Sequence, residues 1–285
     1  MYFVDDHRKS PDEEIKMDKR PIGVFDSGLG GLTMIKKLAE LLPGEDIIYL
    51  GDTGRVPYGS RSRETIVKYA HQDALFLTGF DIKAMVIACN TVCSVAFDAL
   101  ETWYDMPIYE VVSAPVKEAS KLTKNGKIGV IGTAATIRSG AYEASLKEIN
   151  PSLTVHSVPC PLFVPLVEEG WTNAVDEAAL SIAERYLDEL NEFGVDTLIL
   201  GCTHYPLLRD VISKIMGPEV ILVDSGAETA KYVAEDLEKI DMLAENGSGG
   251  TIRYFVTDSI EGFTNLASGF LKADVDGMVE QVTLE

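Results

Sequence analysis

The sequence has little positive charge, no long hydrophobic run and no apolar leader, and each absence excludes a class of protein. Its 25 lysines and arginines stand against 45 acidic residues, which gives a formal net charge of −20. Nucleic-acid binders gain affinity from cationic side chains on phosphates, so we expect no nucleic-acid partner. No apolar run approaches the roughly 18 residues that a membrane-spanning helix needs. Asp5 and Asp6 stand where a signal peptide would be apolar, so we expect a cytoplasmic protein with no membrane partner.

Cysteine is also scarce. The four cysteines, Cys89, Cys93, Cys160 and Cys202, are too few and too scattered over 285 residues for a disulfide framework. Buried thiols, metal ligands and reactive groups remain as the roles to be distinguished.

The hydrophobic residues, 46% of the chain, lie in short apolar runs that alternate with helical patterns. The apolar runs are continuous, as expected for parallel strands that are covered on both faces. Repeated strand–helix units predict an α/β protein with two similar doubly wound parallel-sheet domains and the active site in the cleft between them. We expect strands at 21–25, 46–50, 84–88, 107–111, 127–131, 197–200 and 219–223, and helices at 32–42, 63–77 and 92–103.

The expected domain boundaries place both ends of the chain near one domain. Residues 20–114 and 224–285 would form the first α/β domain, 115–223 the second, and 1–19 a flexible N-terminal extension. Much of the negative charge lies in residues 166–200, with nine acidic residues against one basic, and in 225–285, with twelve against four. Such charge runs are usually solvated helix faces, and we interpret both in that way.

Two of the cysteines directly follow apolar strands, in the segments IACNT (87–91) and LGCTH (200–204). Ligands of open α/β sheets bind outside the carboxyl ends of the strands, so Cys89 and Cys202 could face each other across a cleft. At a helix N-terminus, backbone N–H groups favour a thiolate, which predicts a lowered pKa for Cys89. His204 follows Cys202 by two residues and could hold or relay a proton near neutral pH.

Cys89, Cys93, Cys202 and His204 are also the residue types of a Cys3His zinc site. Their CxxxC and CxH spacings differ from the usual paired pattern of zinc ligands. We therefore expect no metal and assign Cys93, like Cys160, to packing.

Two glycine-containing loops follow the first two expected strands, FDSGLGGLT (25–33) and GDTGRVPYGS (51–60). The first lacks the final glycine of the dinucleotide fingerprint, and Asp26 would repel a pyrophosphate. A small carboxylate ligand fits it better, with Asp26 as a helix cap, a proton acceptor or a partner for an ammonium group. The second loop, which begins near Asp52, reads as an ordinary turn.

In combination, these motifs resemble those of cofactor-independent aspartate/glutamate racemases, and within them the glutamate racemases of bacterial cell-wall synthesis. The likeness runs from about Lys19 to the acidic tail and rests on FDSGLGGL, GDTGRVPYG, VIACNT, IGVIGTAAT, CPLFVPLVEEG and LGCTHYPLL. It implies interconversion of L- and D-glutamate without pyridoxal phosphate or metal, a supply of D-glutamate for peptidoglycan, and commonly a homodimer.

The resemblance also implies roles for single residues. Cys202 would deprotonate L-glutamate and Cys89 would deprotonate D-glutamate, as acid–base groups on opposite faces of Cα. Asp26 and His204, with Asp52 and Glu168 further out, would assist the two thiols. The implied substrate-binding residues are Asp26, Ser27, Pro57, Tyr58, Gly59, Asn90, Thr91, Thr133, Thr136, Thr203 and His204.

Other functions remain open at this point. The same fold could racemise aspartate or another small acid, or the cleft could belong to a zinc-bound or purely regulatory binding protein. Residues 1–16 precede the resemblance and are either a genuine extension or a misplaced start. Arg55 is the only lysine or arginine in the six motifs, so we expect a bound carboxylate to be held by backbone N–H groups, hydroxyls and helix N-termini.

Overall fold

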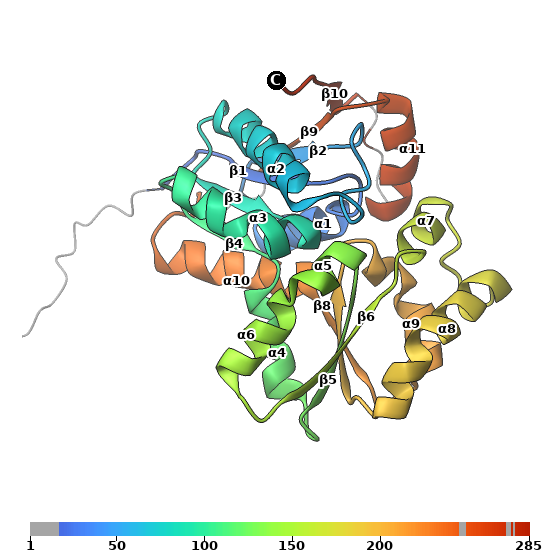
Figure 1. The fold of residues 1–285 in the computed structure, drawn as a ribbon. Helices are drawn as coiled ribbons and strands as arrows, with labels where there is room; N and C mark the ends of the chain where they lie inside the picture. The colour runs from blue at the N-terminus through green and yellow to red at the C-terminus, as the bar shows by residue number, and fades with distance from the viewer. Residues whose placement is uncertain (1–16, 245–248, 272–274, 276) are drawn as a thin grey trace, which may run out of the picture.

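Two parallel β-sheets with helices packed around them make up the computed structural model, which describes residues 17–244, 249–271, 275 and 277–285 (Figure 1). Of the expected extension at 1–19, residues 1–16 lie outside the described residues, whereas Asp18 N donates to Leu243 O at 3.3 Å and Asp18 O accepts from Lys83 Nζ at 2.8 Å. The α/β architecture with two parallel sheets is confirmed. Within the described ranges, no helix is both long and apolar enough to span a bilayer.

The first sheet has six strands in the order β10-β9-β2-β1-β3-β4, and all of its strand pairs are parallel. Its strands are β1 (Ile22–Asp26), β2 (Ile47–Gly51), β3 (Ala84–Ile87), β4 (Ile108–Glu110), β9 (Ile252–Val256) and β10 (Val279–Gln281). The second sheet has four parallel strands in the order β6-β5-β7-β8. Its strands are β5 (Lys127–Gly132), β6 (Thr154–Pro159), β7 (Thr197–Gly201) and β8 (Ile221–Asp224).

Helices connect the strands in both sheets, as parallel pairing requires. They are α1 (Leu32–Leu41), α2 (Arg63–Thr78), α3 (Asn90–Trp103), α4 (Ser113–Leu122), α5 (Ala134–Ser139), α6 (Ala141–Ile149), α7 (Phe163–Glu168), α8 (Glu177–Phe193), α9 (Arg209–Met216), α10 (Ser225–Lys239) and α11 (Ile260–Leu271). A short 3-10 helix, η1 (Tyr205–Leu208), precedes α9.

All seven expected strands are present, with ends shifted by at most two residues. Five of them, β1, β2, β3, β5 and β7, are continuously apolar or glycine-containing and mostly buried, whereas β4 and β8 are only partly buried. Three strands were not predicted, namely β6, β9 and β10. Strands β6 and β10 lie at sheet edges, and β6 is only partly buried, so neither has the continuous apolar run of a central strand.

The two sheets share part of their hydrophobic core. On β5, Ile128 and Val130 belong to the cluster that fills the first sheet, whereas Ile131 belongs to a second cluster beneath α7, α8 and α9. Successive side chains of a strand point to opposite faces, which explains the division. Helix α10 packs against both α1 and α4, next to the crossings of the chain between the sheets. We propose the division at 114/115 and 223/224 as the domain boundary.

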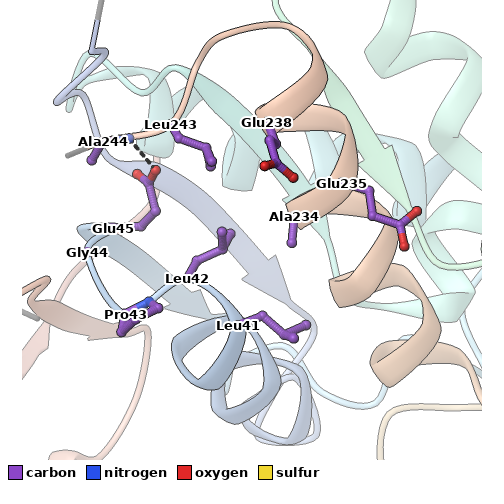
Figure 2. A pocket seen from close by; sticks show the side chains of 10 residues that line it. All are labelled: Leu41, Leu42, Pro43, Gly44, Glu45, Ala234, Glu235, Glu238, Leu243 and Ala244. Atoms are coloured by element: carbon purple, nitrogen blue, oxygen red, sulfur yellow. Dashed lines mark hydrogen bonds between the residues drawn. The ribbon is translucent and has the colours of Figure 1, made fainter. Parts of the chain in front are cut away.

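A buried ion pair fastens the start of β2. Glu45 and Lys83, 4% and 1% exposed, approach to 2.5 Å, and Lys83 Nζ also donates to the backbone oxygen of Asp18. The other oxygen of Glu45 accepts a hydrogen bond from Ala244 N at 2.6 Å, which holds the segment after α10 against this end of the sheet (Figure 2). Removing either partner would leave an uncompensated buried charge.

Candidate active site

A narrow cleft at the carboxyl ends of the strands contains both strand-end cysteines. Its free volume is about 30 Å³, room for one or two water molecules. It is lined by Ser27, Val56, Pro57, Tyr58, Gly59, Cys89, Asn90, Thr91, Thr133, Val164, Cys202, Thr203 and His204. A wider hollow of about 300 Å³ adjoins this cleft and shares with it the lining residues Val56, Pro57, Gly59, Thr133 and Val164. The lining therefore comes from loops of both sheets.

Cys89 lies between β3 and α3, is 4% exposed, and donates a hydrogen bond from Sγ to Ser27 Oγ at 3.2 Å. Burial, with the neighbouring charge of Asp26, raises the pKa of Cys89 to about 12. The prediction that the start of α3 lowers the pKa of Cys89 is therefore wrong. The N–H of Val92 does favour the thiolate, but desolvation outweighs it. Cys89 is a thiol at neutral pH.

Cys202 follows β7 directly and is 5% exposed. Its sulfur lies 3.9 Å from His204 Nδ1, and His204 Nε2 lies 3.3 Å from Glu168 Oε1. Burial alone would lower the pKa of His204, but its hydrogen bonds to Cys202 and Glu168 raise this pKa to about 10. The imidazole is therefore a cation at neutral pH, and it lies directly beside the sulfur of Cys202.

Asp26 lies at the end of β1, close to residues on both sides of the cleft: its charge affects Cys89, and its carboxylate lies near Thr203, the neighbour of Cys202. Its carboxylate is fully buried, accepts a hydrogen bond from Gly28 N at 3.1 Å, and lies 3.5 Å from Thr203 Oγ1. Burial raises the pKa of Asp26, and the charge of His204 opposes the increase. Asp26 does not cap α1, because that helix begins at Leu32.

Asp52 lies behind the cleft, outside its lining, where it holds the loop of Tyr58. Its Oδ2 accepts hydrogen bonds from Arg55 Nε at 2.6 Å and from the Tyr58 hydroxyl. Asp73 on α2 bonds the same two groups, at 2.9 Å from Arg55 Nη2 and 3.0 Å from the Tyr58 hydroxyl. The Tyr58 hydroxyl is therefore held by two carboxyl groups, and Arg55 is engaged by the same two carboxyl groups and by Gln72, to whose Oε1 its Nη1 donates at 2.6 Å.

Sequence reasoning missed Asp73, although a signal was present. The buried positions of α2 are Ile66, Ala70, Asp73, Ala74 and Leu77. Asp73 thus occupies the apolar face of an amphipathic helix, where a carboxylate needs a buried partner. That partner comes from a distant loop and could not be identified from the pattern.

Of the eleven expected substrate-binding residues, nine line the cleft, and Asp26 and Thr136 do not. Thr91 and Thr133 line the cleft, and their hydroxyls lie 2.9 Å apart across the two halves of the site. Thr136 lies behind Thr133, 3.0 Å from it, and is not in the cleft lining.

The side chain of Asn90 is held by two residues that sequence reasoning did not identify. Its Oδ1 accepts a hydrogen bond from the Tyr142 hydroxyl at 2.5 Å, and its Nδ2 donates to Ser225 Oγ at 3.3 Å. Tyr142 also lies 3.0 Å from Val111 O, and Ser225 donates to Leu200 O at 2.9 Å. This buried chain of hydrogen bonds joins the residue after Cys89 to both crossings between the sheets.

The alternative zinc site finds no support in the side-chain arrangement. Cys93 Sγ donates to Ile87 O at 3.2 Å and accepts from Val111 N at 3.4 Å, so its partners are backbone groups. In the described part of the chain, no group of three or more histidine, cysteine, aspartate or glutamate side chains is arranged to hold a metal ion.

A buried polar cleft at the carboxyl ends of parallel strands is the usual small-ligand site of an α/β enzyme. A family model for Asp/Glu/Hydantoin racemase matches residues 22–233. Glutamate racemase from Geobacter metallireducens is 48% identical over 269 residues, which are 94% of this chain and 98% of that protein. This chain belongs to the Asp/Glu/Hydantoin racemase family and is an enzyme of the racemase class.

Solved structures show the same likeness in three dimensions. Glutamate racemase from Francisella tularensis in complex with D-glutamate has a TM-score of 0.87 and 40% identity, covering 94% of this chain and 99% of that one. A glutamate racemase isoform from Bacillus anthracis has a TM-score of 0.87 and 39% identity, covering 93% and 97%. An aspartate racemase from Picrophilus torridus, with a TM-score of 0.57 and 16% identity, shares the fold alone.

Proposed function

We propose that this enzyme interconverts L- and D-glutamate by proton transfer at Cα, with Cys89 and Cys202 as the acid–base pair. The observation that carries the proposal is that both cysteines line one narrow cleft, each at the end of a strand from a different sheet. Racemisation removes a proton from one face of Cα and returns a proton to the other, so it needs groups on two sides of the substrate.

The different surroundings of the two sulfurs support opposite roles in each direction. Cys202, beside the cationic His204, takes the Cα proton of L-glutamate as a thiolate. Cys89, which is a thiol, then donates its proton to the opposite face. This leaves Cys202 as the thiol and Cys89 as the thiolate, so D-glutamate is deprotonated by Cys89 in the reverse direction. Glu168 keeps His204 oriented and charged.

The lining also supports binding of an anionic amino acid without a lysine or arginine. The hydroxyl-bearing residues Ser27, Thr91, Thr133 and Thr203 line the cleft, and the 14-residue helix α3 begins there at Asn90. Backbone N–H groups at the start of such a helix attract a carboxylate. The buried carboxylate of Asp26 is a suitable partner for the substrate ammonium group.

Glutamate is favoured over aspartate as the substrate because the relatives that match nearly the whole chain at 39–48% identity are named glutamate racemases. Incubation in heavy water with L-glutamate, and separately with L-aspartate, tests the proposal. We expect optical rotation to decay and the Cα proton to be replaced by deuterium with glutamate, and far more slowly with aspartate. Faster exchange with aspartate would show that aspartate, and not glutamate, is the substrate. No exchange with either amino acid would refute racemisation by this cleft.

We extend the proposal to the enzyme's place in the cell. Its D-glutamate would supply peptidoglycan synthesis, in the cytoplasm and without a cofactor, and the enzyme would act as a homodimer. The family resemblance supports the peptidoglycan role, the lack of a cofactor and the homodimer. Sedimentation of the purified protein and D-glutamate dependence of a strain that lacks it test the homodimer and the peptidoglycan role.

A further inference from the structure

A buried cluster of hydrogen-bonding side chains lies behind the cleft loop that contains Tyr58. It consists of Asp52, Arg55, Tyr58 and Asp73, and we call it the carboxyl cluster. Both carboxyl groups are fully buried, Tyr58 is 1% exposed, and the side chain of Arg55 is 21% exposed. The cluster has two acidic groups and one cation, so ionisation of both acids would leave a net negative charge away from water, which is costly.

Asp52 has a hydrogen-bond donor at each of its oxygens. Thr257 Oγ1 accepts from Gly54 N at 2.8 Å and donates to Asp52 Oδ1 at 2.7 Å. Arg55 Nε donates to Asp52 Oδ2 at 2.6 Å, and the Tyr58 hydroxyl contacts the same oxygen. Asp52 is therefore supplied with donors on both sides, as an ionised carboxylate requires.

The hydroxyl of Tyr58 has one proton and two carboxyl neighbours. Its oxygen contacts Asp52 Oδ2 and lies 3.0 Å from Asp73 Oδ2. A phenol donates one hydrogen bond, and an ionised carboxylate can only accept. If both acids were ionised, one of the two contacts would bring oxygen lone pairs together without a proton between them. A second proton, carried by one of the acids, removes this conflict.

The donors around Asp73 place the second proton on that residue. Asp73 Oδ1 accepts from Arg55 Nη2 at 2.9 Å, but among the described residues the Tyr58 hydroxyl is the only hydrogen-bonding neighbour of Asp73 Oδ2. Asp73 thus has one donor where Asp52 has two, before the proton of Tyr58 is counted. We infer that Asp73 is a neutral carboxylic acid in the folded enzyme, and that it positions the cleft loop by donating a hydrogen bond to the Tyr58 oxygen. Tyr58 in turn donates to Asp52.

The charges around Asp73 agree with a bound proton. Burial, followed by the charge of Asp52, raises the pKa of Asp73, and Asp26 adds to the increase, whereas the Arg55 cation opposes it. The other titratable side chains of α2 and of the neighbouring helix α3 and strand β9 are further from this balance. They are the partly buried Tyr69, the exposed Arg63, Glu64, Lys68 and His71 on α2, the exposed Asp98 and Glu101 on α3, and the exposed Arg253 and Asp258 on and after β9.

The carboxyl cluster acts on the substrate cleft through the loop of residues 57–59. Pro57, Tyr58 and Gly59 line the cleft, and Gly59 O accepts from Ala135 N of α5 at 3.1 Å. Without a donor at Asp73, we expect this loop to be held less firmly, so that glutamate binds more weakly while proton transfer at Cα is little changed. This effect on binding rests on the proposed racemase function, whereas the protonation of Asp73 does not.

Denaturant unfolding of the wild type and of Asp73→Asn at several pH values tests the proton. Asparagine has the shape of a neutral carboxylic acid and can donate to the Tyr58 oxygen, but it does not titrate. In the unfolded chain Asp73 has the ordinary pKa of about 4, so above that pH the wild type takes up a proton on folding. We expect the unfolding constant of the wild type, divided by that of Asp73→Asn, to rise about tenfold per pH unit from about pH 5 to about pH 7.

The matched control is Asp98→Asn, at an exposed aspartate of α3, for which the same ratio should not change with pH. A ratio for Asp73→Asn that is equally independent of pH would show that Asp73 is ionised in the folded enzyme and would overturn the inference. This measurement needs no turnover, so it decides the state of Asp73 even where racemisation is not observed.

Steady-state kinetics test the positioning role. Asp73→Leu removes the donor, and we expect it to raise KM for glutamate by about tenfold or more with kcat changed by less than about threefold. Asp73→Asn keeps a donor at the same place and should restore KM to within about threefold of the wild-type value. An Asp73→Asn enzyme with the same increase in KM as Asp73→Leu, or an Asp73→Leu enzyme with wild-type KM, would contradict positioning by a neutral donor.

Discussion

The charge on His204 is set by the groups on either side of its ring. Cys202 and Glu168 hold the imidazole in its protonated form despite complete burial, and the raised pKa of about 10 is the result. A base with a raised pKa carries its proton below that pKa and loses it as the pH rises through it. The cation beside Cys202 is therefore present at neutral pH and absent in strong alkali.

This charge predicts an alkaline limb in the pH profile of the enzyme. We expect kcat/KM for L-glutamate to fall as the pH rises through about 10, because His204 then loses its proton and the cleft loses the cationic side chain in its lining. His204→Asn should lack this limb and lose about 100-fold or more in kcat/KM at neutral pH. Initial rates from circular dichroism over the pH range measure both. An unchanged limb in His204→Asn would assign the titration to another group.

The hydroxyl of Tyr58 contacts two buried carboxyl groups, those of Asp52 and Asp73, and stabilises both. Burial and the charge of Asp52 raise the pKa of Asp73, which Arg55 opposes. Tyr58→Phe should lower the free energy of unfolding by about 1–3 kcal/mol, because buried acceptors lose their donor. Denaturant unfolding measures the change. Tyr232→Phe, at a 40% exposed tyrosine, is the control and should stay within about 0.5 kcal/mol.

At the scale of elements, two glycines allow loops from the two sheets to meet. A side chain at Gly30, just before α1, would overlap Thr203 Oγ1 and lie 2.5 Å from His204 Nδ1. A side chain at Gly59 would lie 2.7 Å from Thr133 Cβ. Both contacts join a loop of the first sheet to a loop of the second. The absence of a side chain at Gly30 and Gly59 therefore allows the two loops to approach closely.

Gly30→Ala should therefore separate the two halves of the site. We expect a fall in kcat by about tenfold or more, because Thr203 and His204 must move by a distance that matters for proton transfer. Gly28→Ala is the matched control, since its added carbon would meet Val56 only at 3.4 Å. Steady-state kinetics of both variants measure the difference. Similar losses in the two variants would mean that the loop as a whole, not the contact with His204, is sensitive.

The elements also show how far the sequence could predict this molecule. Central strands such as β1 and β7 were predictable because they are buried on both faces and continuously apolar. Strand β6 was not predictable, because it is a partly exposed edge strand without a continuous apolar run. It is recognised as a strand only by its pairing with β5. Cys89 and Cys202 were predictable as site residues because position at a strand end is a local signal. The contacts of Tyr142 and Asp73 were not, because they join elements distant in the sequence.

At the scale of the whole molecule, the charge of −20 coexists with an anionic substrate because most acidic side chains lie on outer surfaces. In the described part of the chain, only Asp26, Glu45, Asp52 and Asp73 are buried among the acidic residues. Helix α8 buries Ala179, Ala183, Leu187 and Leu190 and exposes its acidic face, as the sequence predicted. Charges separated by more than about 8 Å of water at physiological salt are largely screened. The cleft itself has one cationic side chain, His204, in its lining.

Both halves of the molecule take part in the proposed reaction, since each sheet contributes one cysteine to a shared cleft. Cys89→Ala and Cys202→Ala remove one sulfur each, and Cys160→Ala removes a buried cysteine outside the cleft as the matched control. Circular dichroism in the far ultraviolet shows that each variant has folded.

The decisive measurement is the conversion of L-glutamate to D-glutamate by these three folded variants. We predict that Cys160→Ala racemises glutamate, and that Cys89→Ala and Cys202→Ala each have no measurable turnover in either direction, because a proton can then be moved on only one face of Cα. Sustained racemisation by either Cys89→Ala or Cys202→Ala would contradict the two-thiol account.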